Sequence, residues 1–398
     1  MDNLLIARQS IFDADLHVVA YELILHDPHN VFNSESIAED QLTELFQQLK
    51  TQEVLGDGQI IINFTDDMFD DELNLDIEPE KLIISIDETR VKLDKFIIAS
   101  LKHFRQAGFS IAAKNYSNPK DWQAINQFVG IVRLDMSTMK VDAVQQQVTT
   151  YQNAGFKILA ENIDSHETFE LCKTLGIDLF SGTFLSKPHH KPSDDVSANR
   201  SATLQLLVAL DDPEISIAQV EEILSQDARL SYRLLRIINS AAYGLQRKIE
   251  SLQEAINFMG LVQLRSWASV IIVTSQEGKP TDLMTTTMIR AKMMELLGEF
   301  LGVEYTRTYF MTGLLSTLDA LFDQSMRELL AEIPLNEAVT GALLRFEDTL
   351  GHLLHEVIFY EQGHFDEVSF EEIDASTWSQ IYLESVNWAT VTMNQLES

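Results

Sequence analysis

Short β-branched runs alternate with helical patterns over the first 188 residues, and this alternation constrains the fold more than any other feature. The runs are almost continuously apolar, which is typical of parallel strands buried on both faces. Seven or eight such units favour a compact (β/α) barrel, since no dinucleotide glycine fingerprint follows any run. We expect strands at 18–21, 59–64, 82–86, 109–113, 131–134, 156–160 and 177–180, and helices at 37–50, 90–107, 118–127, 139–153 and 165–175.

Polar or charged residues recur at the carboxyl ends of these runs. In a (β/α) barrel the carboxyl ends of all strands meet at one mouth, where the active sites of this fold are built. Each residue alone could be a strand-end or helix-cap residue, but the repetition indicates a site or the remains of one. The residues are Glu22, Asn63, Asp87, Glu88, Lys114, Asn115, Asp135 and Glu161.

The strand pattern ends near residue 200, and only helical patterns follow. Ser216-x-x-Gln219 and Ser251-x-x-Glu254 are capping boxes, and Gly260 is placed to end the second of these helices. We therefore predict a TIM-like barrel at 1–192, a linker at 193–199 and an all-α domain at 200–398. Further helices are expected near 230–241, 261–275, 282–301, 305–318, 335–345, 349–361 and 376–396.

The charge of the chain is strongly negative, with 29 Lys and Arg against 61 Asp and Glu. Acids outnumber bases 30 to 16 up to residue 192 and 31 to 13 after it, so both halves are acidic. Such a field repels phosphate backbones, and no basic run offsets it. We therefore expect neither nucleic acid nor a membrane as a partner.

Cys172 is the only cysteine, which excludes an intrachain disulfide and a thiolate metal cluster. Its helical, apolar surroundings predict a buried, inert thiol. The opening residues lack the positive region of a signal peptide, and the longest apolar stretches fall short of the ~20 residues that cross a bilayer. These observations predict a cytoplasmic protein.

Two sets of short motifs resemble known families. Ala7–Asp13 (ARQSIFD) and Tyr21–Leu25 (YELIL) resemble the opening of an EAL domain, in the variant form that precedes an HDOD domain. The second half is similar to HDOD domains, and the order and joint spacing of the motifs carry the resemblance. The HDOD-like segments are Asp227–Leu235 (DARLSYRLL), Asn239–Gly244 (NSAAYG), Ala255–Gly260 (AINFMG) and Gly313–Ser316 (GLLS).

The EAL resemblance implies an ancestral hydrolytic site. Active EAL domains hydrolyse cyclic di-GMP with two divalent metal ions held by carboxylates, and a metal-activated water attacks the phosphodiester. By this resemblance, Glu22 matches the acid of the naming motif, Asn63 the strand-end asparagine ligand and Glu161 a later glutamate.

Other positions depart from the EAL pattern. Lys114-Asn115 stand where a pair of aspartates bridges the metals, and Arg133, before Leu134-Asp135, stands where the catalytic lysine is found. Exchanging two bridging carboxylates for a cation and an amide makes the local charge more positive by about three and removes shared metal ligands. Ser85 replaces a glutamate, with Asp87 as a displaced substitute, and Ser181 replaces a late glutamine.

The helical half lacks the site of HD phosphohydrolases. His26-Asp27 spells their metal-binding dipeptide but lies in the barrel half, before Pro28. In the helical half His352 and His355 could form only half of a metal site, and we expect a partly exposed helix face there instead. The absence of this metal site is a further resemblance to HDOD domains, which are regarded as signalling and interaction modules.

We therefore expect a non-catalytic EAL–HDOD regulator without metal or cofactor. Its expected partners are sensor kinases, response regulators or cyclic di-GMP enzymes that control motility and biofilm formation. The interdomain face and the helical face around Asn239 to Gly244 are candidate interaction regions. Cyclic di-GMP itself is disfavoured as a ligand, although Arg133 and Lys114 could meet its phosphates. A metal-free cyclic di-GMP receptor and a residual phosphodiesterase remain the alternatives.

Overall fold

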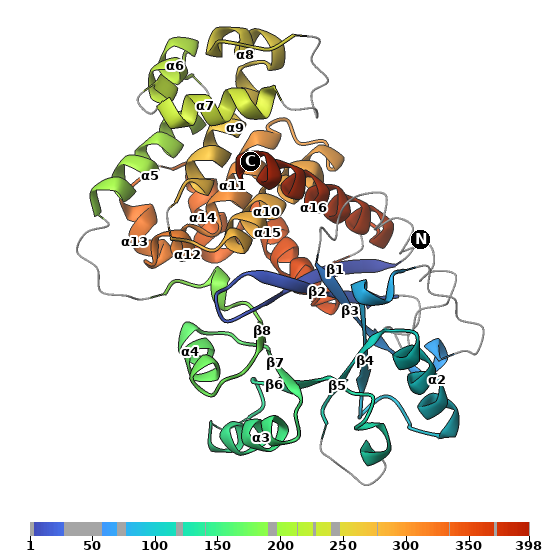
Figure 1. Ribbon diagram of the computed structural model, residues 1–398. Coiled ribbons are helices and arrows are strands. Elements are labelled where there is room, and N and C mark those ends of the chain that lie inside the picture. Colours follow the sequence, from blue (N-terminus) through green and yellow to red (C-terminus); the bar gives the residue numbers. More distant parts are fainter. Residues whose placement is uncertain are drawn as a thin grey trace. The chain divides into compact units, whose positions relative to one another are not determined.

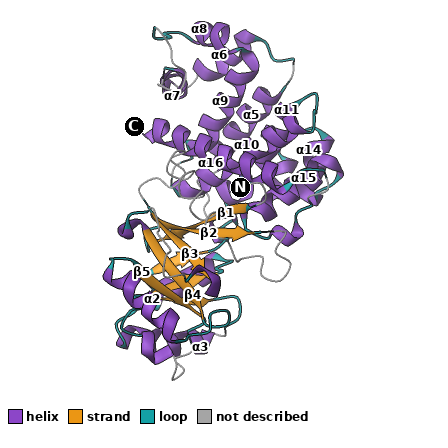
Figure 2. Cartoon of the chain, turned by 90° about the vertical axis from the view of Figure 1, so that its right-hand side faces the viewer, coloured by secondary structure: helices purple, strands orange, loops and turns teal. Residues whose placement is uncertain are grey.

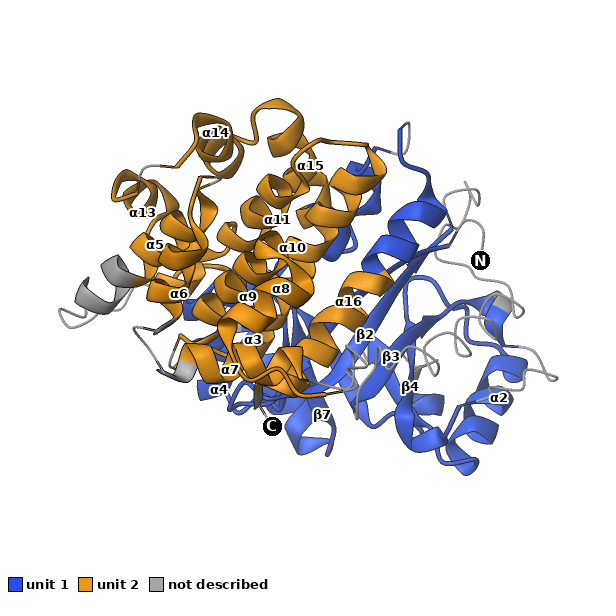
Figure 3. Ribbon diagram, turned by 90° about the horizontal axis from the view of Figure 1, so that it is seen from above, with its two compact units in different colours: residues 1–185, 359–382 blue, residues 186–358, 383–398 orange. Residues whose placement is uncertain are grey.

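The structure is a computed structural model of the chain that forms two compact units (Figure 3). The barrel unit comprises Met1–Leu185 and Phe359–Tyr382, and the helical unit comprises Ser186–Ile358 and Leu383–Ser398. The domain limits expected near residues 192 and 200 stay predictions. The described residues are 4–27, 58–69, 77–116, 122–139, 141–189, 197–212, 214–225, 228–239, 247–276, 278–333, 335–369 and 372–397.

Eight strands close into a barrel in chain order, which confirms the predicted TIM-like fold (Figures 1 and 2). The expected parallel pairing holds from β2 to β8, but β1 is antiparallel to both of its neighbours. The reason is local: a tight turn in which Asp13 Oδ1 accepts the amides of Asp15 and His17 joins β1 to β2, and parallel strands cannot be joined so briefly. The strands are β1 (Leu5–Phe12), β2 (Val18–His26), β3 (Gln59–Phe64), β4 (Leu82–Asp87), β5 (Ser110–Lys114), β6 (Ile131–Asp135), β7 (Lys157–Glu161) and β8 (Leu179–Ser181).

Among the described residues, three helices lie around the outside of the strands: α2 (Lys95–Gln106), α3 (Val141–Asn153) and α4 (His166–Thr174) (Figure 1). The helix expected at 118–127 is instead a 3-10 turn, Trp122–Ile125, within the described part of that range. The helix expected at 37–50 lies outside the described residues. On α4, Cys172 is buried as predicted, and burial raises the pKa of its thiol to about 11, while its inertness stays a prediction.

The barrel interior is built in layers. Because strand side chains alternate with a period of two, residues two apart on one strand point to the same side. A lower layer is apolar and consists of Ile11, Ala20, Ile61, Ile83, Ala112, Ile131 and Leu159. Two positions further along β2 to β7 are Glu22, Asn63, Ser85, Lys114, Arg133 and Glu161. These six predicted site residues therefore lie on the inward face of the barrel, one layer beyond the apolar layer.

The helical unit is all-α in its described residues, as predicted. The first expected capping box forms in both directions: Gln219 N donates to Ser216 Oγ at 3.3 Å and Ser216 N donates to Gln219 Oε1 at 2.9 Å. At the second, Glu254 N donates to Ser251 Oγ at 3.1 Å, but the Glu254 carboxylate accepts the Glu250 amide. Helix α5 begins at Ser197, inside the expected linker. The helices that lie wholly in this unit are α5 (Ser197–Asp211), α6 (Ile217–Ser225), α7 (Ala228–Ile238), α8 (Leu252–Met259), α9 (Leu261–Thr274), α10 (Thr281–Phe300), α11 (Thr306–Leu315), α12 (Leu318–Phe322), α13 (Met326–Ala331) and α14 (Glu337–Arg345).

The core of the helical unit lies around α9, whose residues 264–273 are all buried. Helices α10 and α11 approach closely at Gly313, where an added Cβ would lie 2.7 Å from the Ala291 Cα, so only glycine fits there. Of the candidate interaction face around Asn239 to Gly244, only Asn239 is described, and its side chain bonds to the backbone of Leu235 and Ile249. None of the described helices is both long and apolar enough to span a bilayer.

Candidate functional site

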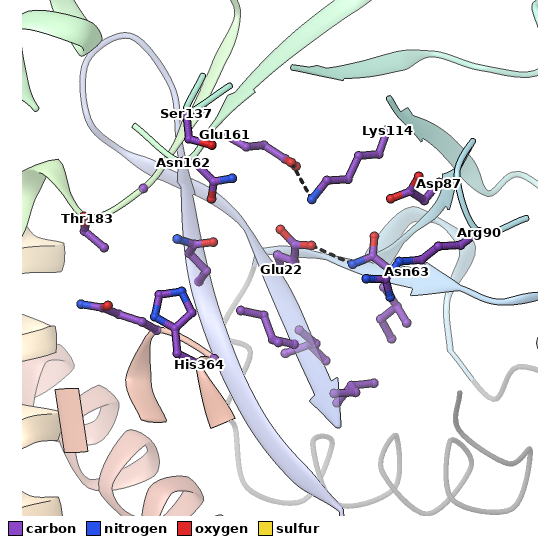
Figure 4. A pocket seen from close by; sticks show the side chains of 18 of the residues that line it. Glu22, Asn63, Asp87, Arg90, Lys114, Ser137, Glu161, Asn162, Thr183 and His364 are labelled. Atoms are coloured by element: carbon purple, nitrogen blue, oxygen red, sulfur yellow. Dashed lines mark hydrogen bonds and ion pairs between the residues drawn. The ribbon is translucent and has the colours of Figure 1, made fainter. Parts of the chain in front are cut away.

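A cavity of about 570 Å³ opens at the carboxyl ends of the barrel strands (Figure 4). This volume is within the usual range for small-molecule sites. Its wall combines strand-end residues with a turn that comes from much later in the chain. The polar residues that line it are Gln9, Glu22, Asn63, Thr65, Asp87, Arg90, Lys114, Ser137, Glu161, Asn162, Asp164, Thr183, Gln362 and His364.

A fully buried arginine occupies the centre of the site. The Arg133 guanidinium donates through Nη2 to Glu22 Oε1 at 2.6 Å and through Nε to Glu161 Oε1. Its Nη1 donates to Asn63 Oδ1 and to Ser85 Oγ, each at 2.7 Å. Four strands therefore converge on one side chain, and every nitrogen of the guanidinium has a partner. We call these five residues the Arg133 network.

The electrostatics of the network favour the charged forms. Burial disfavours the Glu22 carboxylate, but the charge and hydrogen bonds of Arg133 hold its pKa below the usual range. Burial likewise disfavours the Arg133 cation, yet Glu161 and Glu22 together raise the pKa of Arg133. The two directions agree, so the network contains a buried guanidinium facing ionised carboxylate.

The Lys114-Asn115 pair has its own partners. Lys114 Nζ lies 3.2 Å from Glu161 Oε2 (Figure 4). Asn115, in the left-handed conformation, donates through Nδ2 to both oxygens of Asp87 at 3.0 and 3.2 Å. Burial opposes ionisation of Asp87, but the bonds from Asn115 and Thr89 lower its pKa. Both members of the pair thus engage acids of the mouth.

The donor set does not fit the divalent ions that the EAL resemblance implies. Such ions need several carboxylate oxygens that are free to coordinate. Here, Glu22 Oε1 and both Glu161 oxygens face cations, and Asp87 accepts the Asn115 amide. Throughout the part of the chain that the structure describes, no three His, Cys, Asp or Glu residues are arranged to hold a metal ion.

Asp135 and Ser181, two further predicted residues, belong neither to the Arg133 network nor to the contacts of Lys114 and Asn115 described above. Asp135 accepts from the amide and hydroxyl of Ser137 at 2.9 and 2.6 Å and so caps the turn after β6. Ser181 on β8 donates its hydroxyl to the Ser10 carbonyl of β1 at 3.0 Å. Both therefore stabilise the backbone, although each lies on a strand end where the sequence predicted a site.

Sequence reasoning missed one wall of the cavity. Gln362, Gly363 and His364 line it, and they follow helix α15 (Asp348–Glu361) of the region expected to be a separate helical domain. The sequence carries no local signal for this, because the turn lies against β2, at Ile24, which is more than 300 residues away along the chain. The expected helix face at His352 and His355 is found: His352 is exposed and the His355 ring packs on Phe346.

Comparison with known families decides the architecture. Residues 40–188 match the family described as the EAL domain, and residues 200–356 match the family described as the HDOD domain. The chain is an EAL–HDOD protein. The EAL match begins after β2, so Glu22 lies ahead of the matched range.

Two relatives match this EAL–HDOD protein over nearly their whole lengths. The uncharacterized protein YuxH of Bacillus subtilis is 26% identical over 400 residues, covering 96% of this chain and 97% of the relative. The cyclic di-GMP phosphodiesterase CdgJ of Vibrio cholerae is 27% identical over 398 residues, covering 94% and 92%. The solved structure of the EAL enzyme Bd1971 with cAMP and cyclic di-GMP bound has a TM-score of 0.40 and 17% identity, and covers 47% of this chain and 62% of that one.

Proposed function

We propose that this EAL–HDOD protein is a non-catalytic regulator that acts by binding other proteins of a cyclic di-GMP network in the cytoplasm. Its two domains, with a relative named cyclic di-GMP phosphodiesterase, indicate cyclic di-GMP signalling. The non-catalytic part of the proposal rests on one observation: the Arg133 guanidinium and the Lys114 ammonium take the carboxylate oxygens that would hold metal.

The chemistry supports this proposal. Hydrolysis in active EAL domains needs metal ions to lower the pKa of the attacking water and to neutralise the phosphodiester. In this mouth the two positive charges of Arg133 and Lys114 face the two negative charges of Glu22 and Glu161. These side-chain cations neutralise the two carboxylates in place of metal ions, and neither cation can activate a water molecule as a metal ion does.

Two rival functions have specific support. Residual phosphodiesterase activity is favoured by the name of the relative CdgJ and by the retained Glu22, Asn63 and Glu161. A metal-free cyclic di-GMP receptor is favoured by the size of the cavity and by Arg90 and Lys114 in its wall, because phosphate oxygens pair readily with such cations.

One titration separates the three functions. Calorimetry and a hydrolysis assay with cyclic di-GMP are run in Mg²⁺, in Mn²⁺ and in chelator. We expect neither metal-dependent heat nor turnover, and turnover that depends on metal would overturn the proposal. Micromolar binding without turnover would establish the receptor instead. The matched variant Lys114→Asp, Asn115→Asp is expected to gain metal affinity, which would support the assignment of the altered centre.

The partner is tested on the intact protein. The full chain captures proteins from its native host, and each recovered sensor kinase, response regulator or cyclic di-GMP enzyme is then purified and titrated against it. A direct complex that changes the activity of that enzyme supports the proposal. If none of these proteins binds the purified chain, regulation by protein contact is wrong, even if the mouth is inactive.

A further inference from the structure

Strand β1 has an open edge in the described residues. It pairs with β2 over its whole length, but with β8 only at Ile11 and Phe12. Alternate residues of a strand turn their backbone N–H and C=O groups to the same side, so those of Leu4, Ile6 and Arg8 face this edge. Buried backbone groups that lack partners are costly, and an open edge can also recruit another strand.

Three hydroxyl groups from one late segment meet this edge. The segment is Phe359–Tyr382, which belongs to the barrel unit. Its hydroxyls bond to alternate residues, Leu4 just before β1 and then Ile6 and Arg8 in its first half, in the pattern that a neighbouring strand would follow. The bonds are Ser379 Oγ to the Leu4 carbonyl at 2.6 Å, the Ile6 amide to Tyr360 OH at 3.5 Å and the Arg8 amide to Tyr382 OH at 3.0 Å.

The segment is rigidly packed where it supplies these hydroxyls. Tyr360 stacks on Trp378 with ring centroids 5.1 Å apart and meets the edge of Phe365 at the same separation. Tyr360, Trp378 and Tyr382 are all buried. Burial raises the pKa of Tyr382 to about 12, so its hydroxyl stays neutral and available for hydrogen bonding.

The same segment forms part of the mouth. Gly363 has a positive φ of 74°, and an added Cβ would lie 2.6 Å from Ile24 Cδ1, so glycine is required on both counts. The flanking Gln362 and His364 line the cavity, as do Ile24 and its neighbours on β2. A single turn therefore contacts β2 and shapes the site at once.

We propose that Phe359–Tyr382 is an intramolecular clasp that replaces the missing strand neighbour of β1 and forms one wall of the mouth, so that releasing it opens the β1 edge and the cavity together. Both ends of the clasp lie inside helices, α15 (Asp348–Glu361) and α16 (Ala375–Glu397), that continue into the helical unit. The backbone of the helical unit is thus continuous, through these two helices, with the segment that lines the mouth. The clasp holds whether or not the mouth is catalytic.

Amide hydrogen exchange on the full-length protein tests the clasp. Tyr382→Phe keeps the ring and removes one acceptor, so exchange of the Arg8 amide should rise about fivefold, as expected for one lost hydrogen bond of ~1 kcal/mol. The double variant Tyr360→Phe, Tyr382→Phe should release the clasp further and raise exchange at both Leu5–Phe12 and Leu23–Leu25. Tyr305→Phe, an exposed tyrosine of the helical unit, is the matched control and should change neither.

Each result bears on one part of the proposal. If the Arg8 amide of Tyr382→Phe exchanges at the wild-type rate, the Tyr382 hydroxyl does not protect the edge of β1. Faster exchange in β1 with Leu23–Leu25 unchanged in the double variant would overturn the link to the mouth. Gly363→Val should open both regions by displacing the turn from Ile24. Should it fail to fold, the tyrosine variants still decide the question.

Discussion

Buried arginines occur in both units, but the two units compensate them differently. In the barrel, Arg133 faces two carboxylates and two neutral acceptors, and its pKa is raised. In the helical unit, the buried Arg265 and the partly buried Arg307 both face Asp211, whose Oδ1 is 3.8 Å from Arg307 Nε, with weaker charge interactions from Asp212 on Arg265 and from Glu295 on Arg307.

The helical pair directs its hydrogen bonds to a helix end and not to carboxylates. Arg265 Nε and Arg307 Nη2 both donate to the Leu210 carbonyl, at 2.6 and 2.9 Å, near the carboxyl end of α5, where the helix dipole is negative. Burial, aided by repulsion from Arg265, lowers the pKa of Arg307 to about 10, and burial raises that of Asp211. Burial of an arginine therefore does not by itself produce ion pairs. The barrel has them because the carboxylates of Glu22 and Glu161 lie within hydrogen-bond distance of Arg133.

The largest effect is expected for Arg133→Met. The substitution removes the ion-pair partner of Glu22 and leaves Glu161 only its pair with the partly exposed Lys114, and breaking a buried pair in this way costs about 3–5 kcal/mol. Urea denaturation measures the fall in the free energy of unfolding. The control is Arg133→Met combined with Glu22→Gln and Glu161→Gln, which should recover most of the loss. If Arg133→Met has the same free energy of unfolding as the wild type, the ion pairs of Arg133 do not stabilise the fold.

Acid should affect the two units in opposite directions. Glu22 has a lowered pKa, so its stabilisation is complete above the unfolded value and is lost as pH falls through the folded value. Asp211 has a raised pKa, so its contribution to stability rises as pH falls through the folded value. Urea denaturation from pH 7 to pH 3 should therefore show a weaker acid loss in Glu22→Gln and a stronger one in Asp211→Asn. Identical pH profiles for the two variants would contradict this contrast.

A smaller effect is expected for Arg265→Met. The variant loses one bond to the Leu210 carbonyl, but it also removes the repulsion that helps to lower the pKa of Arg307. The free energy of unfolding should change by about 1 kcal/mol, which is ordinary for a single substitution. If this loss equals that of Arg133→Met in the same urea assay, the two units do not differ in the way proposed.

The smallest effect is expected for Lys114→Met. Its side chain is 26% exposed and makes one ion pair with Glu161, which keeps Arg133 as a partner. The stability change should stay within about 0.2–1 kcal/mol, and it should shrink further in high salt because the pair is partly screened. Denaturation at low and high salt checks this, and a salt-independent loss of several kcal/mol would place Lys114 with Arg133 in the buried centre.

The sequence predicted the barrel and the convergence of its strand ends because both follow from local periodicity. Near-continuous apolar runs marked β2 to β8, and the convergence of strand ends in a barrel placed Asn63, Lys114 and Glu161 at one mouth. It missed β1, whose middle residues Arg8, Gln9 and Ser10 are polar and do not read as a buried run.

The centre of the site and its late wall could not be predicted in this way. We expected Lys114 to stand at the metal position, but the longer, forked Arg133 side chain reaches four acceptors from β6. Which of the two cations bonds to the acids depends on distances across the barrel, and the periodicity of the sequence does not give such distances. The clasp depends on contacts between residues 354 to 375 positions apart, and sequence patterns are silent about such pairs.

The clasp also sets an order of events during synthesis. The first strand of the barrel leaves the ribosome early, whereas the hydroxyls that complete its edge are added more than 350 residues later. At synthesis rates of about 5–20 residues per second, the nascent barrel waits on the order of 20–75 s with that edge uncovered. An unpaired strand is a template for aggregation, so this interval is when the chain most needs a chaperone. A premature stop before residue 359 would make that exposure permanent.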